Sequence, residues 1–144
     1  MRRKRAQRIS ASRHMPKRTV LTALIEVRLR DGEALLRSGE PQRRIGAIYV
    51  AGYGLECALK ARLCQDRRAV KLPREFAHHD LRRLVESSTV WPNLKNNKQW
   101  LDTFRALCSE WVVAMRYDVR PYDPTAVRKF IAKIREFAKW LSEN

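Results

Sequence analysis

The chain contains few of the residues that interrupt or cross-link a fold. Among its 144 residues are only five glycines and six prolines, too few for a β-sandwich, which needs a turn about every ten residues. Its three cysteines, Cys57, Cys64 and Cys108, are odd in number and include no C-x-x-C pair. They predict buried thiols in a reducing compartment, hence a cytoplasmic protein, and exclude a disulfide framework. Together with His78 and His79 they lack the paired spacing of a zinc site, so we expect no metal and no other cofactor.

Long apolar runs and acidic residues are also scarce. No stretch approaches 18 consecutive apolar residues, which argues against a transmembrane helix, and no hydrophobic segment follows the basic N-terminus as it would in a secretory signal. The chain contains 31 Lys and Arg but only 15 acidic residues, so its formal net charge is +16. A surplus of this size predicts a polyanionic partner, either a nucleic acid or an anionic membrane surface.

The positive charge is concentrated in two parts of the chain. Residues 1–18 contain eight Lys or Arg and no acidic residue, and residues 60–83 contain eight basic and three acidic residues. We expect residues 1–18 to form a flexible basic arm and residues 19–144 to form a single folded domain. Two interpretations of the arm stay open: a solubilising extension, or an arm that contacts phosphates.

Apolar residues recur at helical spacing throughout the domain. Positions three and four residues apart predict long helices over 19–38, 43–67, 98–115 and 124–144 and a short helix over 80–88. Gly39 is predicted to end the first helix and Pro124 to begin the last. Residues 90–97 are predicted to form a turn, and no segment shows the alternation of a strand. The predicted fold class is therefore all-α, an up-down bundle of four long helices plus one short helix.

The helix predicted over 43–67 is expected to lie at the centre of the bundle. Beside its band of large apolar residues runs a band of small ones: Ala47, Ala51, Gly54, Ala58 and Ala61. Small side chains allow the backbone of another helix to approach closely. The neighbouring stripe is polar and contains Tyr49, Tyr53, Glu56 and Lys60. Glu56 and Lys60 then form either an i, i+4 ion pair at the bundle surface or part of the lining of a cleft.

Two further segments carry candidate functional side chains. RYDVRPY, residues 116–122, brings together Arg116, Tyr117, Arg120 and Tyr122. Guanidinium groups bind phosphate bidentately, and phenols donate hydrogen bonds or stack on bases, although Arg116 also suits the C-terminal end of a helix.

The second segment is the sequence His78-His79-Asp80, which precedes the short predicted helix. Asp80 is predicted to be the N-cap of that helix. Adjacent side chains at a helix start point in different directions, so at most one histidine contributes to a site. His79 is the candidate because it adjoins the helix, and the alternative is a capping or packing role.

Three segments in this order resemble the HEPN domain, above all its compact bacterial and archaeal single-domain members. They are AIYVAGYGLECALKARL (47–63), HHDLRRL (78–84) and W…MRY (111–117), and the likeness covers residues 19–143. The resemblance implies an up-down bundle of four or five helices that usually forms a homodimer. It also implies a role in toxin–antitoxin or phage-defence systems, often beside a small nucleotidyltransferase.

Active HEPN proteins are metal-independent endoribonucleases whose motif is Arg, four to six residues, then His. Arg116 matches the arginine, but the three positions where the histidine is expected are Pro121, Tyr122 and Asp123. The resemblance therefore implies an RNA-binding or nucleotide-binding module with a degenerate nuclease motif. Its cleft is expected between the helices over 43–67 and 98–115.

The resemblance and the residues together define the candidate site. Four residues are expected at the mouth of the cleft: Arg116, Tyr117, Arg120 and Tyr122. Of these, Arg116 and Arg120 are expected to bind phosphate. Glu56 and Lys60 are expected to position that loop or the ligand, and Tyr53 is expected to take part in nucleotide or phosphate binding. Two alternatives stay open: an active RNase that uses His79, with Tyr122 as a second catalytic candidate, and a module whose only role is to bind a nucleotidyltransferase. No membrane partner is expected.

Overall fold

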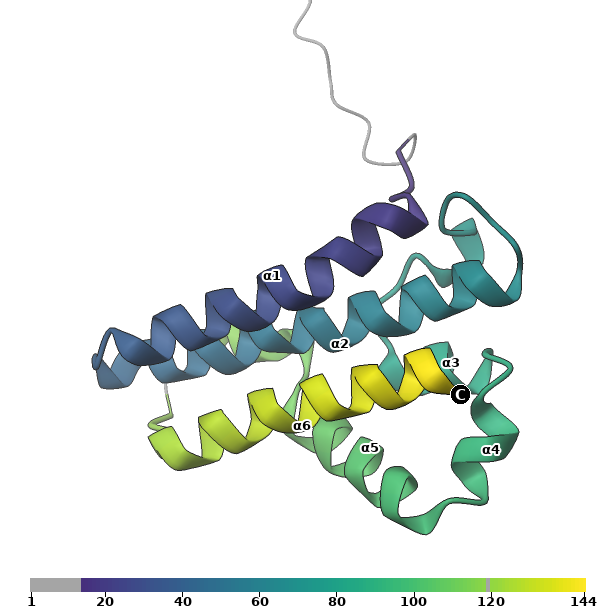
Figure 1. Cartoon of the computed structure of the whole chain (residues 1–144). Helices are drawn as coiled ribbons and strands as arrows, with labels where there is room; N and C mark the ends of the chain where they lie inside the picture. The colour runs from purple at the N-terminus through teal and green to yellow at the C-terminus, as the bar shows by residue number, and fades with distance from the viewer. Residues whose placement is uncertain (1–13, 119) are drawn as a thin grey trace, which may run out of the picture.

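The computed structural model describes residues 14–118 and 120–144, and these residues form a helical bundle (Figure 1). The described α-helices are α1 (Arg18–Arg37), α2 (Arg44–Asp66), α3 (Leu81–Glu86), α4 (Trp91–Lys95), α5 (Lys98–Glu110) and α6 (Pro124–Glu143), with short 3-10 helices η2 (Pro41–Arg43), η3 (Arg74–Phe76) and η4 (Val113–Tyr117). The predicted all-α bundle with four long helices is confirmed. Most of the predicted basic arm, residues 1–13, lies outside the described residues.

Helix α2 lies at the centre of the bundle, with α1 along one side and α6 along another (Figure 1). The predicted close approach of two backbones is found between α1 and α2. A Cβ atom added at Gly54 would lie 3.1 Å from the main-chain oxygen of Ile25, and one added at Gly32 would lie 2.9 Å from that of Ala47. Ala47 and Ala51 are fully buried in the same contact. The small-residue band therefore determines how closely α1 packs.

The helix ends follow the predicted capping signals. Asp80 accepts a hydrogen bond from the Arg83 main-chain N–H at 3.1 Å and caps α3. Pro124 is the first residue of α6, a position that needs no N–H donor. Gly39, with φ of +75°, follows the end of α1. In the described residues, none of the helices has the combination of length and apolar character that crossing a membrane requires.

The fold differs from the sequence prediction at two places. Residues 91–95 form the short helix α4 where a turn was predicted, which Pro92 permits because it lies in the first turn. Helix α5 ends at Glu110 and not at Met115, and the chain is extended at Trp111 and Val112 before it enters η4. Trp111 and Met115 are nevertheless buried, so their spacing correctly identified core residues but not a continuous helix.

A buried polar network joins α2, α6 and the segment after α3. Arg62 donates from Nε to Asp66 at 2.9 Å and from Nη1 to the main-chain oxygen of Leu141 at 2.7 Å. Asp66 also accepts from the Thr89 N–H at 2.8 Å and from its hydroxyl at 2.7 Å. Burial alone raises the pKa of Asp66, but the hydrogen bonds from Thr89 and Arg62 outweigh it, so the pKa lies below its ordinary value.

We expect Asp66→Asn to lower the free energy of unfolding by about 1–3 kcal/mol at pH 7. Because the pKa of Asp66 is lower in the folded than in the unfolded chain, its stabilisation is present above about pH 3.9 and is lost as the pH falls through the folded value. Urea unfolding at pH 7 and pH 3 should therefore show a smaller acid dependence in the variant. The exposed Asp31→Asn, which removes a surface pair with Arg28, should change stability by less than about 1 kcal/mol; equal effects of the two changes would contradict the prediction.

Candidate functional site

A buried carboxylate on α2 holds a partly exposed histidine. The Glu56 side chain is only 6% exposed, whereas that of His79 is 53% exposed. Oε1 of Glu56 lies 2.7 Å from Nδ1 of His79, and Oε2 accepts a hydrogen bond from Nζ of Lys60 at 3.3 Å. The Lys60 side chain is 10% exposed. Of the two interpretations of the Glu56–Lys60 pair, the exposed surface pair therefore does not hold, because both groups are buried and a third residue joins them.

The local chain structure explains why His79, and not His78, reaches Glu56. Phe76 and Leu81 are both buried and anchor the segment between η3 and α3 at its two ends. His78 turns toward the helix start, where its Nδ1 accepts a hydrogen bond from the Asp80 N–H at 3.2 Å. Burial, with the nearby charges of Arg83 and Lys60, lowers the pKa of His78. The geometry therefore separates the two histidines: His79 contacts Glu56, whereas His78 bonds to the start of α3.

Two tyrosines of α2 extend the cluster. The hydroxyls of Tyr49 and Tyr53 lie 2.9 Å apart, and the Tyr53 ring makes edge-to-face contacts with His79 and with Trp111. Burial, then the hydrogen bond with Tyr49 and the charge of Glu56, raise the pKa of Tyr53 to about 12, while Arg116 acts in the opposite direction. The phenol of Tyr53 is therefore protonated at neutral pH and can donate a hydrogen bond, but it does not act as a base.

Arg116 is exposed at the edge of this cluster. Its guanidinium lies 4.9 Å from the centre of the Tyr117 ring and is close enough to Tyr53 to influence the pKa of that phenol. No described carboxylate pairs with Arg116. Its positive charge is therefore available to an anion. The exposed Tyr117 ring stabilises the guanidinium through a cation–π contact.

Arg120 and Tyr122 are placed differently. Nε of Arg120 donates to Asp118 at 2.6 Å, and this hydrogen bond raises the pKa of Arg120. The main-chain oxygen of Tyr122 accepts from Arg44 at 3.2 Å, at the N-terminal end of α2. Glu56 lies twelve residues further along that helix, a distance of about 18 Å. The structure therefore brings Tyr53, Glu56, Lys60, His79 and Arg116 together and leaves Tyr122 apart from them.

The hollow next to His79 lies between α3 and the end of α5. It has a cavity volume of about 230 Å³ and is lined by His79, Arg82, Cys108 and Trp111 among others. A second hollow of about 210 Å³ shares Arg82 and Cys108 and continues to Trp91 and Arg105. Of the lining residues, only His79 was predicted from the sequence; Arg82, Cys108, Trp111, Trp91 and Arg105 were not, although Arg82 belongs to the basic concentration at 60–83. We predicted a cleft directly between the helices over 43–67 and 98–115. The hollow instead involves α3, because α3 lies against α2 there.

Within the described part of the chain, no three His, Cys, Asp or Glu side chains gather in a way that would hold a metal ion. Comparison of the chain with protein-family models, with curated proteins and with solved structures gave no match. The resemblance to the HEPN domain therefore rests on its sequence segments alone. The geometry itself offers an exposed cation, a protonated phenol and an imidazole held by a buried carboxylate.

Proposed function

We propose that this chain is a HEPN-like module that binds RNA or a nucleotide through Arg116, Tyr117, Tyr53 and His79. The observation that carries the proposal is the exposed guanidinium of Arg116, which has no described carboxylate partner, contacts the Tyr117 ring and influences the pKa of Tyr53. Guanidinium groups bind phosphate strongly, and aromatic rings stack on bases. Arg82, which lines the hollow next to His79, adds a second positive charge.

We expect Arg116→Ala to weaken the binding of a fluorescently labelled single-stranded RNA by about tenfold, because a charge-assisted phosphate contact is lost. The slope of log affinity against log salt should become shallower by about one, as expected for one phosphate contact. Fluorescence anisotropy at several salt concentrations measures both quantities. Competition with ATP shows whether a mononucleotide binds at the same site as the RNA.

Arg128→Ala is the matched control for this experiment. Arg128 is an exposed arginine of α6 whose described contact is a weak hydrogen bond to Thr125 at 3.4 Å. The control removes the same charge at a different place, so it should leave RNA affinity nearly unchanged. If the two variants bind equally well, the assigned role of Arg116 is wrong.

A second candidate function is metal-independent RNA cleavage, and the Glu56–His79 hydrogen bond is the observation that favours it. A buried carboxylate at Nδ1 orients the imidazole and leaves its other nitrogen free for proton transfer. Nε2 of His79 would take the proton of a ribose 2′-hydroxyl, whose oxygen then attacks the phosphorus. The bond from phosphorus to the 5′-oxygen breaks, and that oxygen takes a proton from water, so the products are a 2′,3′-cyclic phosphate and a 5′-hydroxyl. The hydroxide left behind takes the proton from His79, which restores the neutral imidazole. Arg116 would stabilise the charge on the phosphorane.

If the chain cleaves RNA, His79→Ala should reduce the rate at least about a hundredfold, which is the usual contribution of a general base. The assay uses single-stranded RNA in EDTA, and the analysis identifies the ends of the products. His78→Ala removes the neighbouring imidazole, which does not contact Glu56, and should retain activity. Cleavage that survives His79→Ala, or that persists on 2′-deoxy substrates, would exclude this mechanism.

The resemblance to the HEPN domain also suggests a homodimer and a protein partner. We propose that the module forms a homodimer and works in a toxin–antitoxin or phage-defence system, with a nucleotidyltransferase as a possible protein partner. Light scattering at micromolar concentration tests the dimer, and a monomer there would contradict it. A neighbouring nucleotidyltransferase gene, together with no affinity for RNA or ATP, would favour a purely protein-binding role.

A further inference from the structure

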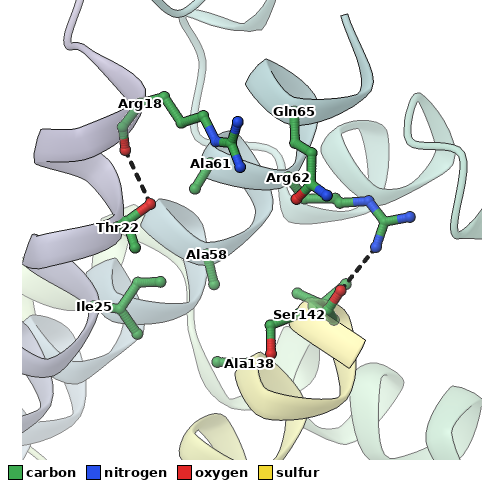
Figure 2. A pocket seen from close by; sticks show the side chains of 10 residues that line it. Arg18, Thr22, Ile25, Ala58, Ala61, Arg62, Gln65, Ala138 and Ser142 are labelled. Atoms are coloured by element: carbon green, nitrogen blue, oxygen red, sulfur yellow. Dashed lines mark hydrogen bonds between the residues drawn. The ribbon is translucent and has the colours of Figure 1, made fainter. Parts of the chain in front are cut away.

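A pocket different from the two hollows near His79 lies on another side of α2, where the N-terminal half of α1 and the C-terminal end of α6 diverge (Figure 2). Its cavity volume is about 350 Å³, which is within the range of small-molecule sites. It shares no residue with the site around Glu56 and His79. Successive residues of an α-helix are turned by 100°, so Ala58 and Ala61 lie on nearly the opposite face of α2 from Glu56 and Lys60. The pocket is therefore independent of the proposed RNA site.

The lining of the pocket contains charged, hydroxyl and apolar side chains. Figure 2 shows the guanidinium groups of Arg18 and Arg62 on one side of Ile25, Ala58 and Ala138, while the hydroxyl groups of Thr22 and Ser142 lie beside the apolar side chains. The pocket therefore offers a place for a charged group and a place for a hydrocarbon body.

The two guanidinium groups differ in how many hydrogen bonds and ion pairs they make within the protein. Arg62 is held in place by Asp66 at 2.9 Å, by the main-chain oxygen of Leu141 at 2.7 Å and by the hydroxyl of Thr89 at 3.1 Å. Arg18 is exposed and has no ion pair with any described residue. Its main chain is fixed, because its N–H donates to Val70 at 2.8 Å and its carbonyl accepts from Thr22 at 3.0 Å. The Arg18 side chain therefore lines the pocket from a fixed point of the backbone, and its positive charge is not compensated by a described residue.

We propose that this pocket binds a small amphipathic anion, with a carboxylate or phosphate headgroup at Arg18 and an alkyl body over Ala58 and Ala138. The headgroup gains charge-assisted hydrogen bonds from Arg18. The alkyl body covers the half-buried side chains of Ile25 and Ala138 and removes their exposed parts from water, which the hydrophobic effect favours. An anion without an alkyl body, or an alkyl alcohol without a charge, satisfies only one end of the pocket.

Isothermal titration calorimetry on the full chain with four probes tests the proposal: decanoate, decyl phosphate, decanol and inorganic phosphate. We expect decanoate or decyl phosphate to bind with one site per chain, and the tighter of the two identifies the headgroup. Decanol and inorganic phosphate should bind at least about tenfold more weakly, because each lacks one of the two contributions. Decanol that binds as tightly as both anionic probes would overturn the proposal.

Three variants locate the binding. Arg18→Gln should weaken the anionic probes about tenfold, and Ala138→Met should weaken them similarly, because its longer side chain fills the pocket from a half-buried position on α6. Arg37→Gln is the control, since Arg37 is an exposed arginine at the other end of α1. Circular dichroism confirms that each variant is folded. Affinity that is unchanged in both Arg18→Gln and Ala138→Met, or lowered equally by Arg37→Gln, would place binding elsewhere and refute the proposal.

Discussion

Gly52→Ala is expected to lower the free energy of unfolding by about 3 kcal/mol, because a methyl group at this position has no space. A Cβ atom added at Gly52 would lie 2.0 Å from Cδ1 and from Nε1 of the Trp111 indole. The indole cannot easily move, since it is 2% exposed and its Nε1 donates to the main-chain oxygen of Tyr49 at 2.9 Å. Urea unfolding followed by circular dichroism measures the effect.

Gly46→Ala is a matched control on the same helix. A Cβ atom at Gly46 would meet only a Leu35 methyl group at 3.8 Å, an ordinary contact. This change should stabilise the protein by about 0.5–1 kcal/mol, because alanine favours the helix more than glycine does. Gly52→Ala in a Trp111→Ala background should cost much less than it does alone, because the clash is gone. Equal costs in the two backgrounds would show that Trp111 is not the reason for Gly52.

Glu56→Gln is expected to cost about 3 kcal/mol of stability, close to the effect of breaking a buried ion pair. The substitution keeps the shape of the side chain but removes the negative charge that Lys60 and His79 share. Lys60 is then a buried cation without a counter-charge, which is unfavourable. Urea unfolding at pH 7 measures the change.

The exposed pair Lys98–Asp102 is the comparison for the buried one. Both pairs have i, i+4 spacing, but the Lys98 and Asp102 side chains are 90% and 53% exposed. Asp102→Asn should therefore cost less than about 0.5 kcal/mol. Adding Lys60→Met to Glu56→Gln should recover part of the loss, because the uncompensated charge is removed as well. If the double variant is as unstable as the sum of the two single variants, burial of the charge is not the cause.

Periodic segments were the most predictable part of the fold. The helices at 18–37, 44–66 and 124–143 match their predicted ranges within about two residues, because each has an apolar stripe. The first and the last also have a recognisable stop or start signal, Gly39 and Pro124. The end of α5 was not predictable in the same way. Trp111 continues the helical spacing of the apolar residues, yet it leaves the helix to place its indole over Gly52, a partner 59 positions earlier in the chain.

In the candidate site, too, the features set by residues close together in the chain were predictable, and those set by contacts between distant residues were not. The stripe of Tyr53, Glu56 and Lys60 was visible in the sequence, because steps of three and four place side chains on one helix face. That His79 completes it, and that the neighbouring hollow opens toward Arg82 instead of lying between α2 and α5, depends on how the segment after η3 packs on α2. No local pattern encodes that packing.

By itself, the sequence determined the all-helical fold class, the central position of α2, the capping residues and the group of polar side chains that share one face of that helix. These features depend on residues within a few positions of one another, and helical periodicity makes them readable. Only the tertiary structure decided that Glu56 is buried between Lys60 and His79, that Arg116 stays unpaired beside Tyr53, and that an amphipathic pocket opens between α1 and α6. Those outcomes depend on contacts between residues distant in the chain, which arise only when the helices pack together.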